Sequence, residues 1–71
     1  MMPLTYINPG ETAMIQRVGG NPDVKRHLET LGFVPGGNIS VISALNGNII
    51  VDVKGARIAI SREMAQKVFA C

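Results

Sequence analysis

The chain has 71 residues, of which 46% are hydrophobic and 17% charged, and its formal net charge is +2. At this length only roughly 60% of the unfolded chain's surface is buried on folding, so a deep enzyme pocket would compete with the core for side chains. One cysteine excludes an internal disulfide, and no apolar run approaches the roughly 18 residues of a membrane-spanning helix. We therefore expect a single binding or regulatory domain, residues 1–71, in a reducing cytoplasmic setting without direct membrane insertion.

The N-terminal residues 1–10 end in an Asn-Pro-Gly turn signal. Their apolar side chains are expected to attach this segment to the core: Leu4, Tyr6 and Ile7. A strand is predicted over residues 11–18, but its facing is ambiguous, because Ala13 and Ile15 share one side while Met14 lies on the other. We expect this strand to be bent or covered on both faces.

Residues 22–31 carry the signals of a short amphipathic helix. Asn21 can cap its N-terminus, Pro22 suits the first helical position, and Gly32 can adopt the left-handed conformation that ends a helix. Pro35 then prevents the helix from resuming. The apolar positions follow helical spacing and predict one buried stripe: Val24, Leu28 and Leu31.

Two hairpins are predicted to follow. In the first, a two-residue Asn46-Gly47 loop would pair Val41 with Asp52 and mix polar with apolar residues on one face. A three-residue loop, 46–48, instead pairs Val41 with Val53 and leaves that face almost wholly apolar. We therefore predict the odd-length loop, although Asn-Gly is the typical signal of a two-residue type I′ turn.

In the second hairpin, a two-residue Gly55-Ala56 loop pairs Val53 with Ile58. The two hairpins together predict a three-stranded meander with one apolar face. The residues assigned to that inner face are Ile39, Val41, Leu45, Ile49, Val51, Val53, Ile58 and Ile60.

The closing segment has two interpretations. One is a helical turn near residues 61–66, capped by Ser61, followed by a short strand; the other is a continuous helix that turns Met64 and Phe69 inward. Either one completes a small, mostly β barrel of about five strands with one inserted helix at about residues 22–31, because curling a sheet protects its edges.

A resemblance to a known family lies in residues 27–42, HLETLGFVPGGNISVI, followed by a hairpin and VDVKGARIAISREMA. This region resembles the FeoA family, small cytosolic proteins of bacterial ferrous iron transport, and the similarity extends over nearly the whole chain. The family pattern L-x-x-L-G-[LF]-x-P-G-x-x-[IV]-x-[IV] is met by Leu28, Leu31, Gly32, Phe33, Pro35, Gly36, Ile39 and Val41. One departure is His27, where the family commonly has arginine.

The resemblance implies an SH3-like barrel and a regulatory role by protein contact. The implied partner is the cytoplasmic part of the membrane GTPase that transports ferrous iron. The alternative is an SH3-like interaction domain related to the C-terminal domain of metal-dependent transcriptional repressors. Acting as a repressor alone would require a DNA-reading helix-turn-helix, and no segment of the sequence predicts one.

Enzymatic, metal-binding and nucleic-acid-binding functions are poorly supported. His27 and Cys71 are single residues far apart in sequence, so they predict neither a catalytic pair nor a typical structural zinc site, and we expect no cofactor. The basic residues are dispersed along the sequence and only three aromatic residues accompany them, which argues against a nucleic-acid partner.

Six residues are candidates for partner contact: Lys25, Arg26, His27, Phe33, Ile42 and Ile50. Each also has a structural interpretation. The three polar residues can form the solvated face of the helix, and Phe33 can fold back against Leu28 as a hydrophobic cap contact. Ile42 and Ile50 are expected on the outer face of the sheet, where another segment can cover them or they can form an apolar patch for association.

Overall fold

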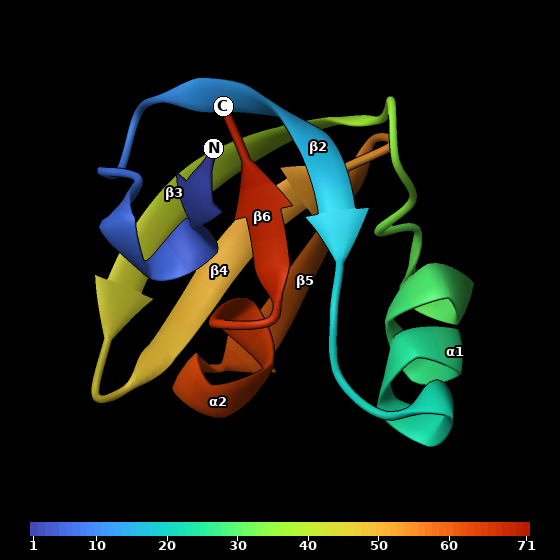
Figure 1. The fold of residues 1–71 in the computed structure, drawn as a ribbon. Coiled ribbons are helices and arrows are strands. Elements are labelled where there is room, and N and C mark those ends of the chain that lie inside the picture. The colour runs from blue at the N-terminus through green and yellow to red at the C-terminus, as the bar shows by residue number, and fades with distance from the viewer.

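The computed structural model describes residues 1–71, and six antiparallel strands form one strongly curved sheet (Figure 1). In chain order the elements are β1 (Met2–Pro3), η1 (Leu4–Tyr6), β2 (Thr12–Val18), α1 (Pro22–Leu31), β3 (Asn38–Leu45), β4 (Asn48–Val53), β5 (Ala56–Ser61), α2 (Arg62–Ala65) and β6 (Val68–Ala70). The strand order is β1-β6-β2-β3-β4-β5. The predicted mostly β barrel is confirmed, with the two-residue β1 as a strand beyond the five expected.

The boundaries of α1 match the predicted helix. The Asn21 side-chain oxygen accepts a hydrogen bond from the Val24 N–H at 2.9 Å, and Pro22 occupies the first turn. At the other end Gly32 has a φ of 108°, and the Phe33 N–H donates to the Leu28 carbonyl at 3.0 Å. This six-to-one bond is the Schellman arrangement, which satisfies a carbonyl that the helix leaves free.

The corner between α1 and β3 is held by β2 rather than by a ligand. The Gly36 N–H donates to the Ile15 carbonyl at 2.8 Å, and the Ile15 N–H donates to the Gly37 carbonyl at 2.8 Å. Gly36 has a φ of 87°, a conformation that glycine adopts readily. The glycines of this corner therefore serve chain reversal and pairing with β2.

A bulge in β2 resolves the ambiguous facing of this strand. Its register against β6 shifts between Ile15 and Arg17, which leaves Gln16 as an extra residue. Because of this shift Ile15 and Val18, three positions apart, are both buried, whereas Met14 is exposed. The expected bend in this strand is confirmed.

The predicted register of the first hairpin is wrong. Asn46 and Gly47 form the two-residue turn, both with positive φ as a type I′ turn requires, and Leu45 pairs with Asn48. A two-residue turn in a regular ladder would pair Val41 with the polar Asp52. A second bulge, between Val41 and Ser43, shifts the pairing by one residue, so that Val41 pairs with the apolar Val51. The sequence reasoning assumed a regular ladder, so it placed the extra residue in the loop instead of in the strand.

The second hairpin also turns at a different place from the one predicted. Lys54 and Gly55 form the turn, again with positive φ at both residues, so Val53 pairs with Ala56 and Val51 pairs with Ile58. The predicted partner of each residue is displaced by two positions along the strand. Each side chain therefore still faces the predicted side of the sheet. Asp52 therefore lies opposite Arg57, a better electrostatic pairing than the expected Lys54 with Arg57.

The closing segment follows the first of its two interpretations. The Ser61 hydroxyl accepts a hydrogen bond from the Met64 N–H at 3.3 Å and caps α2. The chain then leaves the helix and forms β6, which pairs with both β1 and β2. A continuous helix is excluded. The C-terminal strand β6 lies between β1 and β2 in the curved sheet (Figure 1).

The core is a single apolar cluster without buried polar or charged residues. Most of the predicted inner face contributes to it, as do Leu4 and Ile7 of the N-terminal segment. Two expectations are wrong, because Tyr6 is 71% and Leu45 66% exposed. The core residues are Leu4, Ile7, Ala13, Ile15, Val18, Leu28, Phe33, Ile39, Val41, Ile49, Val51, Val53, Ile60, Ala65, Val68 and Ala70.

Gly32→Ala tests whether the end of α1 also fixes the packing of this helix. A Cβ at Gly32 would lie 2.9 Å from the Val53 Cγ1, whereas a Cβ at Gly36 would meet nothing within 4 Å. Both glycines have positive φ, which costs another residue about 1–2 kcal/mol. We expect Gly32→Ala to lower the free energy of unfolding, measured by urea denaturation, by about 1 kcal/mol more than Gly36→Ala. Equal losses would show that α1 does not pack tightly on Val53.

Candidate functional site

The exposed face of α1 carries three of the candidate contact residues. Lys25, Arg26 and His27 are all exposed, because the helix turns its apolar stripe inward. Leu28 is buried, and Val24 and Leu31 are half-buried against the core. The short helix therefore holds three consecutive polar side chains in solvent.

Two lysines from distant segments lie beside the ends of α1. A Cβ added at Gly20 would lie 2.9 Å from the Lys67 Cδ and 3.2 Å from the Val24 Cγ1. Lys67 therefore lies beside the start of the helix. A Cβ at Gly32 would lie 3.7 Å from the Lys54 Cδ, so Lys54 lies by its end. The fold thus adds two basic residues that the sequence analysis did not connect with the helix.

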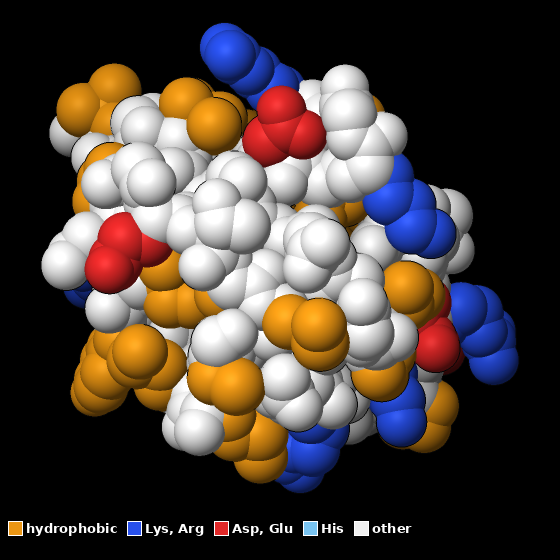
Figure 2. Space-filling model, turned by 90° about the horizontal axis from the view of Figure 1, so that it is seen from above, with side chains coloured by type: hydrophobic (Ala, Val, Ile, Leu, Met, Phe, Trp, Pro, Cys, Tyr) orange, Lys and Arg blue, Asp and Glu red, His pale blue; other side chains and the backbone are white.

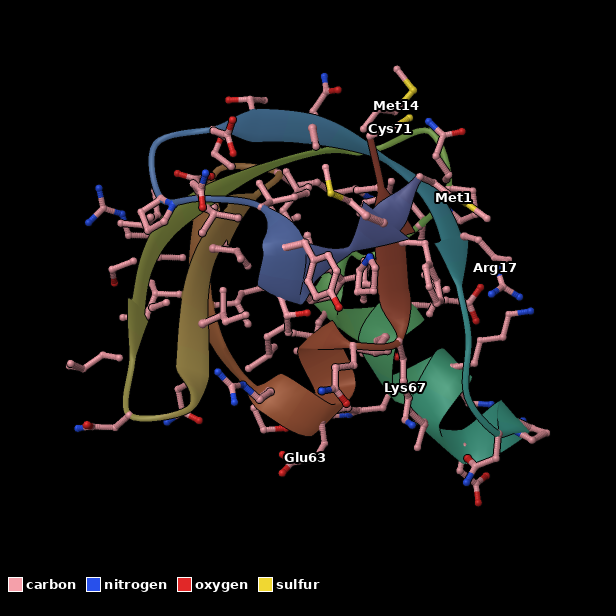
Figure 3. The ribbon with its side chains drawn as sticks, turned by 60° about the vertical axis from the view of Figure 1, so that its left-hand side comes forward. Met1, Met14, Arg17, Glu63, Lys67 and Cys71 are labelled. Carbon is pink, nitrogen blue, oxygen red and sulfur yellow. The ribbon has the colours of Figure 1, made fainter.

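Arg17 extends the same side of the molecule from β2. Its guanidinium carbon lies 4.6 Å from the centroid of the Phe69 ring, within the range of a cation–π interaction. Figure 3 shows Arg17 and Lys67 projecting outward on the side where α1 lies. We call the basic surface the set Arg17, Lys25, Arg26, Lys54 and Lys67.

Charge is distributed unevenly over the molecule. The basic surface holds five of the seven Lys and Arg residues, and only Asp23 and Glu29 lie within it on α1, a formal charge of +3. The other two cations and three carboxylates give the rest of the chain a charge of −1. Figure 2 shows Lys and Arg side chains on the side on which α1 lies in Figure 1, with an acidic side chain beside them, and others at the opposite edges of this view. This asymmetry can steer and orient a negatively charged partner.

Phe33 does not belong to an exposed contact surface. Its side chain is 0% exposed and is a member of the core, and its N–H is bonded to the Leu28 carbonyl. The structural interpretation of Phe33, as the apolar residue of the helix cap, fits this placement. An anchor that protrudes toward a partner is excluded for this conformation of the chain.

Ile42 and Ile50 lie on the outer face of the sheet, as predicted. Ile42 is the bulge residue of β3 and is 37% exposed, and Ile50 is half-buried between Ser43 and Ala59 in the neighbouring strands. They reach this face through the bulge rather than through the odd-length loop. They form a small apolar patch on the meander, apart from the basic surface.

A second candidate for contact is a shallow groove at the far end of the meander. It has a volume of about 200 Å³ and lies between η1, the Asn46-Gly47 turn and Arg62 of α2. Leu45 lines it, and the exposed Tyr6 neighbours its residue Thr5. The sequence analysis missed both apolar residues; the Asn-Gly signal, had it been followed, would have placed Leu45 at the exposed tip.

The titratable residues do not gather into a typical metal centre. The structure contains no group of three or more His, Cys, Asp or Glu side chains that could hold a metal ion. His27 lies on the exposed face of α1, and the exposed Cys71 follows β6. None of the helices is both long and apolar enough to pass through a membrane.

The curved antiparallel sheet and the helix inserted after its first long strand define a small SH3-like domain. The family model described as FeoA domain matches residues 2–70, and the chain belongs to this family. The family assignment rests on almost the entire chain.

Individual relatives agree with this assignment. The chain is 31% identical over 68 residues to a Methanocaldococcus jannaschii protein provisionally named Fe(2+) transport protein A, a match that covers 96% of this chain and 83% of the relative. A crystal structure of an iron uptake regulatory protein, FeoA, is similar with a TM-score of 0.91 and 30% identity, covering 99% of this chain and 93% of that one.

The same fold occurs inside larger proteins. A manganese-dependent transcriptional repressor is similar with a TM-score of 0.88 at 20% identity, and the match covers 96% of this chain but only 39% of the repressor. At this level of identity the comparison shows a shared fold alone. The kinship to repressor domains that the sequence suggested is therefore one of architecture.

Stability measurements separate the exposed candidates from the buried one. We expect Lys25→Glu and Arg26→Glu to change the free energy of unfolding by less than about 0.5 kcal/mol, because both side chains are exposed. Phe33→Ala should lower it by about 3–5 kcal/mol, because it leaves a cavity in the core. Urea denaturation followed by circular dichroism measures all three. A Phe33→Ala variant as stable as the parent would contradict the core role.

Proposed function

We propose that this protein is a small cytoplasmic accessory protein of ferrous iron transport, and that it acts by binding the cytoplasmic part of the membrane GTPase that moves the iron. The observation that carries the proposal is the match of nearly the whole chain to the FeoA family, together with a relative named for Fe(2+) transport. A regulatory contact fits a 71-residue domain whose buried side chains are all apolar and form one core.

The basic surface is the part of the molecule best suited to such a contact. Its cations come from β2, α1, the β4–β5 turn and the segment before β6, so a correctly folded domain is needed to bring them together. Long Lys and Arg side chains increase the rate of encounter with an acidic partner and orient it, while the more apolar contacts add affinity. We infer that the docking region of the GTPase carries a net negative charge opposite α1.

A separate role as a repressor domain has less support. The repressor match covers a minority of that chain, whereas the FeoA crystal structure is matched over nearly its full length. The shared architecture is compatible with a common use of SH3-like domains as contact modules. The iron-transport proposal accounts for the family match and for the length of the FeoA crystal structure, of which the match covers 93%.

The proposal is tested with the purified protein and the isolated cytoplasmic domain of the GTPase, by isothermal titration calorimetry. We expect binding to weaken as salt is raised and Lys25→Glu/Arg26→Glu to weaken it by about tenfold or more, because two attractive contacts become repulsive. The matched control is Arg62→Glu, which reverses an exposed charge on α2, outside the basic surface.

Two results would count against these assignments. If the parent protein does not bind the GTPase domain at low salt, the partner is wrong. If Arg62→Glu weakens binding by about tenfold or more while Lys25→Glu/Arg26→Glu binds normally, the contact lies at the groove beside α2 instead.

A further inference from the structure

The turn between β3 and β4 places an asparagine directly before a glycine at the exposed tip of the hairpin. Asn46 has a φ of 52° and Gly47 a φ of 82°, and both residues are exposed. The Gly47 N–H donates no hydrogen bond within the chain, and the Asn46 side-chain amide makes none either. Neither group is therefore held by a partner in the fold.

These two groups are the reactants of deamidation. The Gly47 nitrogen attacks the side-chain carbonyl carbon of Asn46: a C–N bond forms between them, and the bond from that carbon to the side-chain nitrogen breaks. The side-chain nitrogen leaves as ammonia, taking up the proton that the Gly47 N–H loses. Water then opens the cyclic imide at either of its two carbonyls, and the product is aspartate or isoaspartate. The net reaction consumes one water and releases one ammonia, and it needs no oxidant or cofactor.

Gly47 leaves the attacking nitrogen uncrowded. It has no side chain of its own, and a Cβ added there would meet nothing within 4 Å, so no neighbouring segment covers this position. The turn must open for the nitrogen to reach the Asn46 side chain. Exposed loop tips are among the segments that open at low free energy, without unfolding of the core.

The other four asparagines of the chain lack this combination. Two precede proline, whose nitrogen carries no proton to lose. Two precede isoleucine, whose branched Cβ crowds the nitrogen, and these two begin β3 and β4, where strand pairing restrains the backbone. The four pairs are Asn8-Pro9, Asn21-Pro22, Asn38-Ile39 and Asn48-Ile49.

We propose that Asn46 is a site of spontaneous deamidation that changes the charge of the groove beside α2. Arg62 is the only charged residue that lines this groove, so a carboxylate at position 46 cancels its formal charge. Isoaspartate also adds a carbon to the main chain of the turn that pairs Leu45 with Asn48, which disturbs its two-residue geometry. The basic surface contains no asparagine, so the reaction is separate from the proposed GTPase contact.

The site is tested by incubating the folded protein at mildly alkaline pH in water labelled with ¹⁸O. The protein is then digested with trypsin in ordinary water and analysed by tandem mass spectrometry. Trypsin releases residues 27–54 as one peptide, which carries Asn38, Asn46 and Asn48 and so compares three asparagines directly. We expect ¹⁸O at Asn46 alone, incorporated more slowly than in protein unfolded in urea, because the turn must open first. Deamidation during digestion would incorporate ordinary oxygen and is thereby excluded.

Gly47→Ala should slow the reaction at Asn46 by about tenfold, a rise of about 1.4 kcal/mol in its barrier, because the added methyl group crowds the attacking nitrogen. The matched control is Gly55→Ala, because this glycine of the second hairpin also has a positive φ, of 79°, and open surroundings. It should leave the rate at Asn46 unchanged, and circular dichroism should show that both variants keep the fold.

Three results would overturn the proposal. The first is no ¹⁸O at Asn46 of the folded protein under conditions in which the urea-unfolded protein reacts. The second is equal labelling of Asn38 or Asn48 in the folded protein. The third is a rate at Asn46 that is the same in Gly47→Ala as in Gly55→Ala.

Discussion

The structure depends on how a 71-residue chain curls one sheet tightly enough to enclose a core. A flat sheet of this size would leave most of its apolar face in water, and a strongly bent strand needs a local break in its pairing. Two such breaks occur, at Gln16 in β2 and at Ile42 in β3. Each adds one residue to its strand and bends it: Val18 is buried after the first bulge, and the second allows Val41 to pair with Val51 in the core.

The same curvature explains the placement of α1. The helix leaves the sheet after β2 and returns at the Gly36-Gly37 corner, whose backbone is bonded to Ile15 beside the first bulge. Its C-terminal glycine approaches Val53 so closely that a side chain there would collide. The helix is thus tied to the bent sheet beyond its C-terminal end, and the burial of Leu28 turns its polar face toward solvent.

The helix, its caps and the closing turn could be predicted from sequence because their signals are local: Asn21, Gly32 and Ser61 each act within a few residues. The register of the hairpins could not, since a bulge changes parity as an extra loop residue does, and the choice between them depends on tertiary curvature. This is why the pairing of Val41 with Val53 was wrong even though the inner face was largely correct. The same error assigned Leu45 to the inner face, although its side chain is exposed.

Some residues of the candidate site could also be placed from the sequence, and others could not. Lys25, Arg26 and His27 could be placed in solvent from helical periodicity, but Lys54 and Lys67 reach α1 only through long-range packing. Phe33 was a candidate contact residue because it lies in a glycine-rich corner. Its side chain is buried in the core, which only the tertiary packing shows. Because the basic surface is assembled from four segments, no contiguous sequence motif marks it.

The most direct test of the account is an NMR titration of the ¹⁵N-labelled protein with the isolated cytoplasmic domain of the GTPase. The account predicts that the amide shifts that change most belong to α1 and to the residues next to Lys54 and Lys67, and that these changes shrink at high salt. Changes concentrated instead around Leu45 and Arg62, unaffected by salt, would contradict the assignment of the basic surface as the docking site.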